Sequence, residues 1–123
     1  MSKVNSYRDL EVWRSGIDIT KRIYELCRHL PSEEKFGLIS QMQRSASSVP
    51  ANIAEGWARD SIKDYLRHLS IARGSLAELE TFITLCSELG FVESDRLERL
   101  LHDSAVLGKQ INRLQSALRK HTT

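Results

Sequence analysis

Residues 61–89, SIKDYLRHLSIARGSLAELETFITLCSEL, decide the fold class of this chain. Apolar side chains recur there at intervals of three and four residues, which is the spacing of one face of an α-helix. The apolar face comprises Ile62, Tyr65, Leu69, Ala72, Leu76, Leu79, Ile83 and Cys86. A flank beside it comprises Ile71, Phe82, Leu85 and Leu89. The stretch therefore predicts one long amphipathic helix with apolar surface on more than one side.

The same periodicity predicts helices over residues 8–30, 36–59 and 94–120. Residues that end or cap helices separate them: Pro31 follows the first, Ser61 or Asp60 caps the third, and Gly90 suits the left-handed position after it. The connections are short, so helices adjacent in sequence should be antiparallel neighbours. The sequence predicts an all-α chain with a single domain over residues 1–123, folded as an antiparallel up-down-up-down four-helix bundle.

Pro50 lies inside the second predicted helix, where it lacks the N–H that would bond to the carbonyl of Ala46. The apolar stripe continues in phase from Val49 to Ile53 and Trp57. We therefore expect a bend at Pro50 rather than a helix end, with the freed carbonyl bonded by Ser47, Ser48 or water.

Composition excludes several classes of protein. The 123 residues are 41% hydrophobic and 28% charged, with a net charge of +2, which is typical of a globular domain and argues against disorder. The sequence has no apolar run of membrane-spanning length. Its two cysteines, Cys27 and Cys86, form no CxxC pair. We expect a reduced cytoplasmic protein that does not associate with membranes.

Helix faces predict self-association. Two adjacent apolar stripes cover about half of the first helix, against the ~100° that a surface helix needs. One stripe holds Leu10, Trp13, Ile17, Tyr24 and Cys27, and the second runs from Val12 to Leu30. The second helix carries few charges, so another copy could pack closely against it. The predicted interface comprises Val12, Ile19, Ile23, Leu26, Arg44 and Ser47.

The sequence offers little catalytic chemistry. It contains no Glu-x-x-His, HExxH, CxxC or phosphate-binding glycine motif. Acid–histidine pairs such as Asp64/His68 have i,i+4 spacing, which is typical of a surface pair on one helix. Cys27 and Cys86 lie on apolar faces, where cysteine is usually inert. We predict no catalytic residue, no metal and no cofactor.

A set of polar residues in the second and third helices has two interpretations. The set comprises Asn52, Glu55, Arg73, Glu78 and Glu80. The favoured interpretation is a hydrogen-bonded network that fixes helix register and subunit orientation, since buried polar groups are normally satisfied. The alternative is a polar pocket at a subunit interface, with Asn52, Glu55 and Arg73 as contacts to a small ligand or substrate.

Three sequence blocks resemble a known family. Residues 48–56, SVPANIAEG, resemble the SxPxNIAEG signature of the bacterial four helix bundle protein family, also called the ribosomal RNA intervening-sequence protein family. Residues 7–13, YRDLEVW, and 71–80, IARGSLAELE, resemble its other two blocks. The resemblance implies a cytoplasmic four-helix bundle that assembles as a ring-shaped homopentamer. A similar branch, the accessory variability proteins of diversity-generating retroelements, binds nucleic acid beside a reverse transcriptase.

The last helix ends in basic residues without acidic ones. Between residue 109 and the C-terminus, the charged residues are Lys109, Arg113, Arg119 and Lys120. If the chain binds RNA or DNA, we expect these residues to be the contacts. The alternative, which is the more common reason for cations at a helix C-terminus, is a favourable interaction with the helix dipole. The leading hypothesis is a non-enzymatic homo-oligomer that associates weakly with nucleic acid. The alternatives are the interfacial enzyme or ligand pocket, and a protein that partners a toxin or polymerase.

Overall fold

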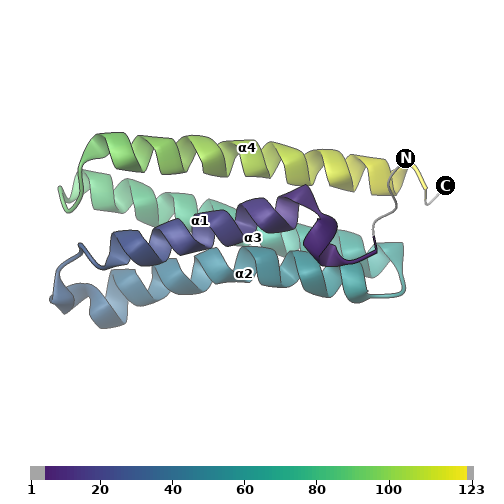
Figure 1. The fold of residues 1–123 in the computed structure, drawn as a ribbon, viewed down its shortest axis with the longest axis horizontal. Coiled ribbons are helices and arrows are strands. Elements are labelled where there is room, and N and C mark those ends of the chain that lie inside the picture. The colour runs from purple at the N-terminus through teal and green to yellow at the C-terminus, as the bar shows by residue number, and fades with distance from the viewer. Residues whose placement is uncertain (1–4, 122–123) are drawn as a thin grey trace.

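The computed structural model describes residues 5–121 and consists of four long helices (Figure 1). They are α1 (Glu11–Cys27), α2 (Ser40–Ala58), α3 (Ile62–Glu88) and α4 (Ser94–Arg119). Short 3-10 turns cover Tyr7–Asp9 and Ser32–Glu34, and one π-helical turn, Lys35–Ile39, leads into α2. Among the described residues there is no strand, which confirms the all-α prediction. Residues 1–4 and 122–123 of the predicted domain lie outside the described residues.

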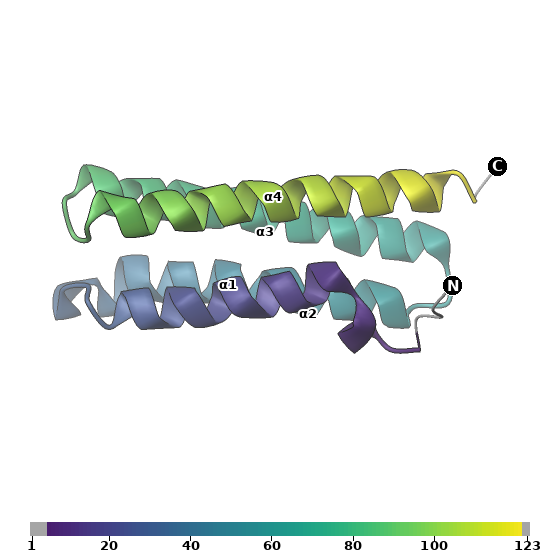
Figure 2. The ribbon, with the colours of Figure 1, turned by 45° about the horizontal axis from the view of Figure 1, so that its top comes forward.

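The helices form an up-down-up-down bundle. Figure 1 shows that successive helices run in opposite directions, with the α1–α2 and α3–α4 connections at one end and the α2–α3 connection at the other. In Figure 2, α3 and α4 lie above α1 and α2. The pair α2–α3 packs most extensively, and α1–α4 has the least contact of the four neighbouring pairs. The bundle is therefore tightest on one side and more open on the opposite side.

Two turn positions confirm the sequence prediction. The Ser61 side chain accepts a hydrogen bond of 3.0 Å from the backbone N–H of Asp64, so Ser61 is the N-cap of α3. Gly90 follows α3 with a φ of 71°, the left-handed conformation that favours glycine.

The core corrects the interface prediction for α1. Val12, Ile19, Ile23 and Leu26 are at most 6% exposed within a single chain, so they pack in the bundle's own core and are not a surface for another copy. The other stripe lies at the edge of the core, where Trp13 is partly buried and Tyr24 is 46% exposed. The prediction was wrong because two adjacent stripes are equivalent on an isolated helix. The positions of α2 and α4 decide which stripe faces inward.

Pro50 lies inside α2, and the helix continues through it without a break. The hydroxyl of Thr20 lies 3.1 Å from the carbonyl oxygen of Ala46 and 2.7 Å from that of Gly16, so its hydrogen is shared between them. A Cβ on Gly16 would lie 3.2 Å from Cβ of Pro50, so α1 approaches the proline closely. Thr20 of α1 is thus a donor to the freed carbonyl, and Ser47 and Ser48 bond elsewhere. The bend itself stays a prediction.

None of the helices within residues 5–121 has the length and apolarity needed to cross a membrane. Both cysteines are buried, and burial raises the pKa of each thiol to about 11. The thiols therefore stay protonated near neutral pH, which suits core residues and not nucleophiles.

Candidate functional site

A closed polar cluster joins α2 to α3. Its centre is His68, which is 4% exposed. Nδ1 of His68 lies 3.1 Å from Oδ1 of Asn52. The Asn52 amide donates to the carbonyl oxygen of Ser48 at 2.9 Å and to its hydroxyl at 3.0 Å. The Ser48 hydroxyl in turn lies 2.8 Å from that of Ser75, so a chain of hydrogen bonds runs between the helices.

The geometry of this cluster assigns the proton on the imidazole of His68. Because the Asn52 NH₂ group faces Ser48, its carbonyl oxygen faces His68, and Nδ1 must be the donor. Nε2 faces the guanidinium of Arg67 at 3.4 Å, and a guanidinium can only donate. A neutral imidazole protonated at Nδ1 satisfies both contacts. Oε2 of Glu55 lies 3.8 Å from Nδ1 of His68, and Oε1 of Glu55 accepts a 2.9 Å hydrogen bond from Nη2 of Arg59.

Gly56 makes room for the cluster. A Cβ at this position would lie 2.8 Å from Cβ of His68 and 3.0 Å from Cδ1 of Tyr65. Any larger residue would therefore push α3 away from α2. The hydroxyl of Tyr65 is buried without a hydrogen-bond partner, and burial raises its pKa to about 12.

The sequence interpretation assigned His68 to a surface pair with Asp64. The structure instead places His68 inside, against Asn52 and Glu55 from the neighbouring helix. The signal that could have found it is Gly56, since a glycine within a helix is typical of close approach by another element. Asn52 and Glu55 do meet in one cluster, but Arg73 is not part of it.

A second polar cluster joins α3 to α4. Gln115, which is 0% exposed, accepts a hydrogen bond of 3.3 Å from Nη1 of Arg73 and donates one of 3.1 Å to the hydroxyl of Ser70. Two turns further along α3, the carboxylate of Glu80 accepts a 2.7 Å hydrogen bond from the buried hydroxyl of Ser104. Of the predicted network, Arg73 and Glu80 therefore bond to α4, and Glu78 is exposed.

A cavity of about 300 Å³ lies between these two α3–α4 contacts. Its polar lining residues are Arg73, Glu80, Lys109 and Asn112. Its remaining lining residues are small or aliphatic: Leu76, Ala77, Ala105 and Gly108.

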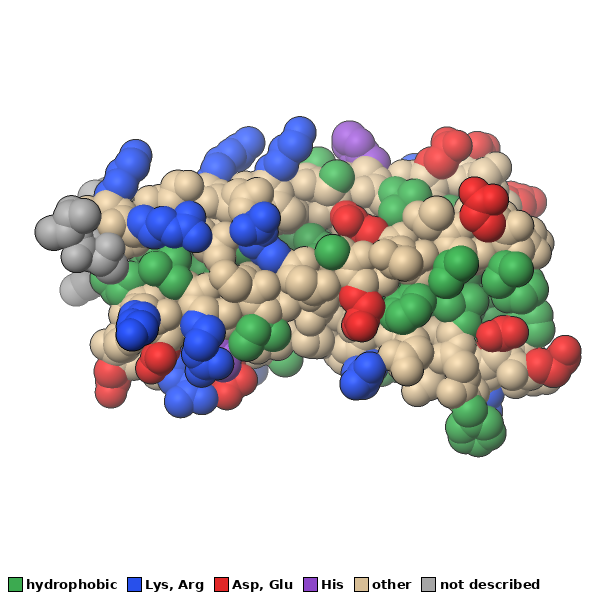
Figure 3. All heavy atoms as spheres, turned by 180° about the vertical axis from the view of Figure 1, so that it is seen from behind, with side chains coloured by type: hydrophobic (Ala, Val, Ile, Leu, Met, Phe, Trp, Pro, Cys, Tyr) green, Lys and Arg blue, Asp and Glu red, His purple; other side chains and the backbone are tan. Residues whose placement is uncertain are grey.

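The predicted nucleic-acid contacts Lys109, Arg113, Arg119 and Lys120 are all exposed at the C-terminal half of α4 and just beyond it. Figure 3 shows the face seen from behind, on which Lys and Arg side chains gather toward one end. Most of the acidic and exposed hydrophobic side chains on this face lie toward the other end (Figure 3). Although the net charge is only +2, positive and negative side chains on this face are separated along the bundle.

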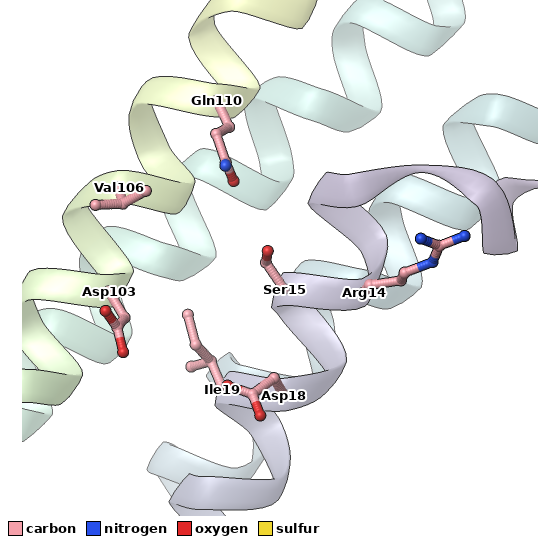
Figure 4. A pocket seen from close by; sticks show the side chains of 7 residues that line it. All are labelled: Arg14, Ser15, Asp18, Ile19, Asp103, Val106 and Gln110. Atoms are coloured by element: carbon pink, nitrogen blue, oxygen red, sulfur yellow. The ribbon is translucent and has the colours of Figure 1, made fainter. Parts of the chain in front are cut away.

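A second cavity of about 300 Å³ lies between α1 and α4 (Figure 4). The Ser15 hydroxyl and the Gln110 amide point toward one another across it (Figure 4). The Gln110 NH₂ group donates to Glu11 at 3.2 Å, and its carbonyl oxygen is buried without a partner. Beside this cavity, Arg22 bonds to Asp103 at 2.7 Å and bridges α1 and α4. Burial opposes its charge, but the bonds to Asp103 and Asp18 raise its pKa.

Exposed apolar residues lie on the flank of α3. Ile71 is 40% exposed, Leu85 43% and Leu89 56%. The neighbouring outer face of α2 is built mostly from small residues but also carries Arg44 and Glu55. Both predicted interface residues of α2, Arg44 and Ser47, are exposed there. Within the described part of the chain, no group of three or more His, Cys, Asp or Glu side chains could hold a metal ion.

Comparison with known proteins agrees with the sequence resemblance. No curated protein matches the chain. Among solved structures, a protein of unknown function from the S23 ribosomal protein family of Bacteroides thetaiotaomicron VPI-5482 is 27% identical, with a TM-score of 0.79. The similarity covers 85% of this chain and 97% of that chain. The family model described as 23S rRNA-intervening sequence protein matches residues 8–113, and the chain belongs to this family.

Proposed function

We propose that this chain is a non-enzymatic helical bundle that assembles with copies of itself and binds nucleic acid weakly and without sequence preference. The observation that carries the proposal is the exposed cationic stripe of α4, Lys109, Arg113 and Lys120. No acidic residue occurs after Asp103 in the sequence, so no nearby carboxylate on the same helix neutralises it.

The stripe suits a phosphate backbone better than a base. It extends over about 16 Å of helix axis, at about 1.5 Å per residue. Lysine and arginine on a convex helix face can contact phosphates along a strand, but phosphate contacts carry no sequence information. So few contacts give weak binding that falls steeply with salt.

Assembly would strengthen this contact. The exposed flank Ile71, Leu85 and Leu89 lies beside the small-residue face of α2, and together they offer an apolar surface for another copy. The family resemblance implies a pentameric ring. A ring would repeat the cationic stripe and raise the apparent affinity by multivalency.

The geometry does not favour the alternative of an enzyme or ligand pocket around Asn52, Glu55 and Arg73. Asn52 and Glu55 are engaged with His68, whereas Arg73 bonds to Gln115 on the other side of α3. Burial raises the pKa values of Cys27, Cys86 and Tyr65 and so favours their neutral forms. A nucleophile would need a lowered pKa, which favours the anion.

Filter binding with single-stranded RNA in low and moderate salt tests the nucleic-acid contact. Changing Lys109, Arg113 and Lys120 to Gln should lower low-salt affinity by about tenfold or more and flatten the salt dependence. The matched control changes three exposed cations elsewhere, Lys21, Lys35 and Arg99, to Gln. If both triple variants lost the same affinity, the loss would come from the lower net charge alone, and this would contradict the proposed surface.

Light scattering tests the assembly. The wild-type chain should have the mass of an oligomer at micromolar concentration, and Leu85→Asp should give a folded monomer. Ile19→Asp should instead unfold the chain, because Ile19 is only 4% exposed within one chain. The control is His102→Asp, an exposed position on α4 away from the apolar flank. A wild-type monomer would contradict self-association.

A further inference from the structure

The α3–α4 cavity brings three hydrogen-bond donors from two helices to one place. Arg73 comes from α3, and Lys109 and Asn112 come from α4. The contacts Ser70–Gln115 and Glu80–Ser104 fix the antiparallel register, which places Lys109 between the levels of Arg73 and Glu80. A guanidinium, an ammonium and an amide together present donors of the kind that a tetrahedral oxyanion accepts.

Arg73 is held in position before any ligand arrives. Its Nη1 donates to Oε1 of Gln115, a fully buried side chain that Ser70 also holds. One N–H of its five is used in this way, and the guanidinium remains at the surface. Such preorganisation lowers the entropy lost when a flexible arginine binds an anion.

The shape and charge of the cavity confine an anion to one end. Ala77, Ala105 and Gly108 have little or no side chain, so the space between the helices stays open. Glu80 lies at the far end, about 10 Å along α3 from Arg73 at 1.5 Å per residue. Its carboxylate would repel an anion, and therefore the end formed by Arg73, Lys109 and Asn112 is the favourable one.

We propose that Arg73, Lys109 and Asn112 form a phosphate-binding site in the α3–α4 cavity, which seats one phosphate group of a nucleic-acid backbone. The identity of the phosphate's source rests on the proposed function; the site itself does not. Lys109 belongs to both the cavity and the stripe of α4, and Arg113 lies one turn further along the helix. A strand seated in the cavity can therefore continue along the stripe.

Inorganic phosphate, titrated at constant ionic strength and followed by amide NMR shifts, tests the site alone. The wild-type spectrum should shift around residues 73 and 109–113. Arg73→Gln should weaken phosphate binding about tenfold, as expected for a lost charge-assisted hydrogen bond. Arg99→Gln, an exposed arginine at the other end of α4, is the matched control and should change the affinity less than twofold. Equal affinity in Arg73→Gln and wild type would overturn the proposal.

Gln115→Leu separates positioning from charge. It removes the partner of Arg73 while the net charge of the protein stays the same. Phosphate affinity should fall about threefold, with an unchanged dependence on ionic strength. Unchanged phosphate affinity in this variant would overturn the positioning role of Gln115.

Two further outcomes distinguish this inference from the proposed function. If wild-type protein binds RNA through the stripe but phosphate causes no shift at the cavity, the site is refuted and the proposed function stands. If phosphate binds as described but RNA does not bind, the site stands and the proposed function is refuted.

Discussion

The two sides of α3 carry polar clusters of opposite character. Toward α2, His68 is buried and satisfied by Asn52, with Glu55 and Arg67 closing its exposed edge. Toward α4, Gln115 and Ser104 are buried, but Arg73 extends from Gln115 to the surface beside a cavity. Both ring nitrogens of His68 at the centre of the closed cluster already have partners, so we assign this cluster a structural role. The open cluster presents charge to solvent, so it is available for binding.

Removing the centre of the closed cluster should have the largest effect. His68→Ala leaves a cavity and an unpaired Asn52 carbonyl, and the free energy of unfolding should fall by about 3 kcal/mol. Urea denaturation followed by circular dichroism measures the change. The exposed His102→Ala is the control and should alter stability by less than about 0.5 kcal/mol. A small loss for His68→Ala would contradict a structural role for the closed cluster.

Alkaline pH should destabilise the chain through its two buried thiols and the phenol of Tyr65. Cys27 and Cys86 have pKa values raised to about 11, and Tyr65 to about 12. Above the ordinary thiol pKa, the unfolded chain releases protons that the folded chain retains. Stability from these groups is complete below pH 8.5 and is lost as pH rises toward 11. With two thiols, we expect the free energy of unfolding to fall by about 3 kcal/mol by pH 10.

Denaturant midpoints measured at pH 8, 9 and 10 test this dependence. Cys86→Ala is less stable at every pH because it truncates a core side chain, but its decline between pH 9 and 10 should be about half that of wild type. Parallel declines in the two proteins would show that the thiols do not cause the pH dependence.

The open cluster should tolerate change best. Gln115→Leu replaces a buried amide with an apolar side chain of similar size, and both former partners can bond to water. We expect a stability change of less than about 1 kcal/mol in either direction, measured by the same denaturation as His68→Ala. A loss as large as that of His68→Ala would remove the distinction between the two clusters.

Sequence periodicity predicted the helices because each one carries a continuous apolar face. It also predicted an N-cap at Ser61 or Asp60, of which the structure has Ser61, and the turn at Gly90, where single residue types determine local geometry. It failed for the two stripes of α1, since Ile19 and Tyr24 both fit an apolar face. Which of them is buried depends on where the other helices pack, and a single helix does not contain that information.

The polar residues were harder to group. Arg73 was predicted to meet Asn52 and Glu55, but it lies five residues from His68 and therefore about 140° around α3. That angle alone separates the two clusters and could have been obtained from the sequence. Nothing in the sequence indicates that Gln115 is buried, because a glutamine beside leucines in a helix can lie equally well on the surface. Its partner Arg73 lies 42 residues earlier and becomes its neighbour only after folding.

The proline of α2 makes one helix depend on another for its completion. Pro50 has no N–H to donate to the carbonyl of Ala46, and the hydroxyl of Thr20 from α1 replaces that donor. A hairpin of α1 and α2 that slipped by one turn would bury that carbonyl unsatisfied, at a cost of about 1–3 kcal/mol. The slipped hairpin would also bring a side chain other than Gly16 against the proline ring. A residue that weakens an isolated helix therefore selects the correct pairing of two helices during folding.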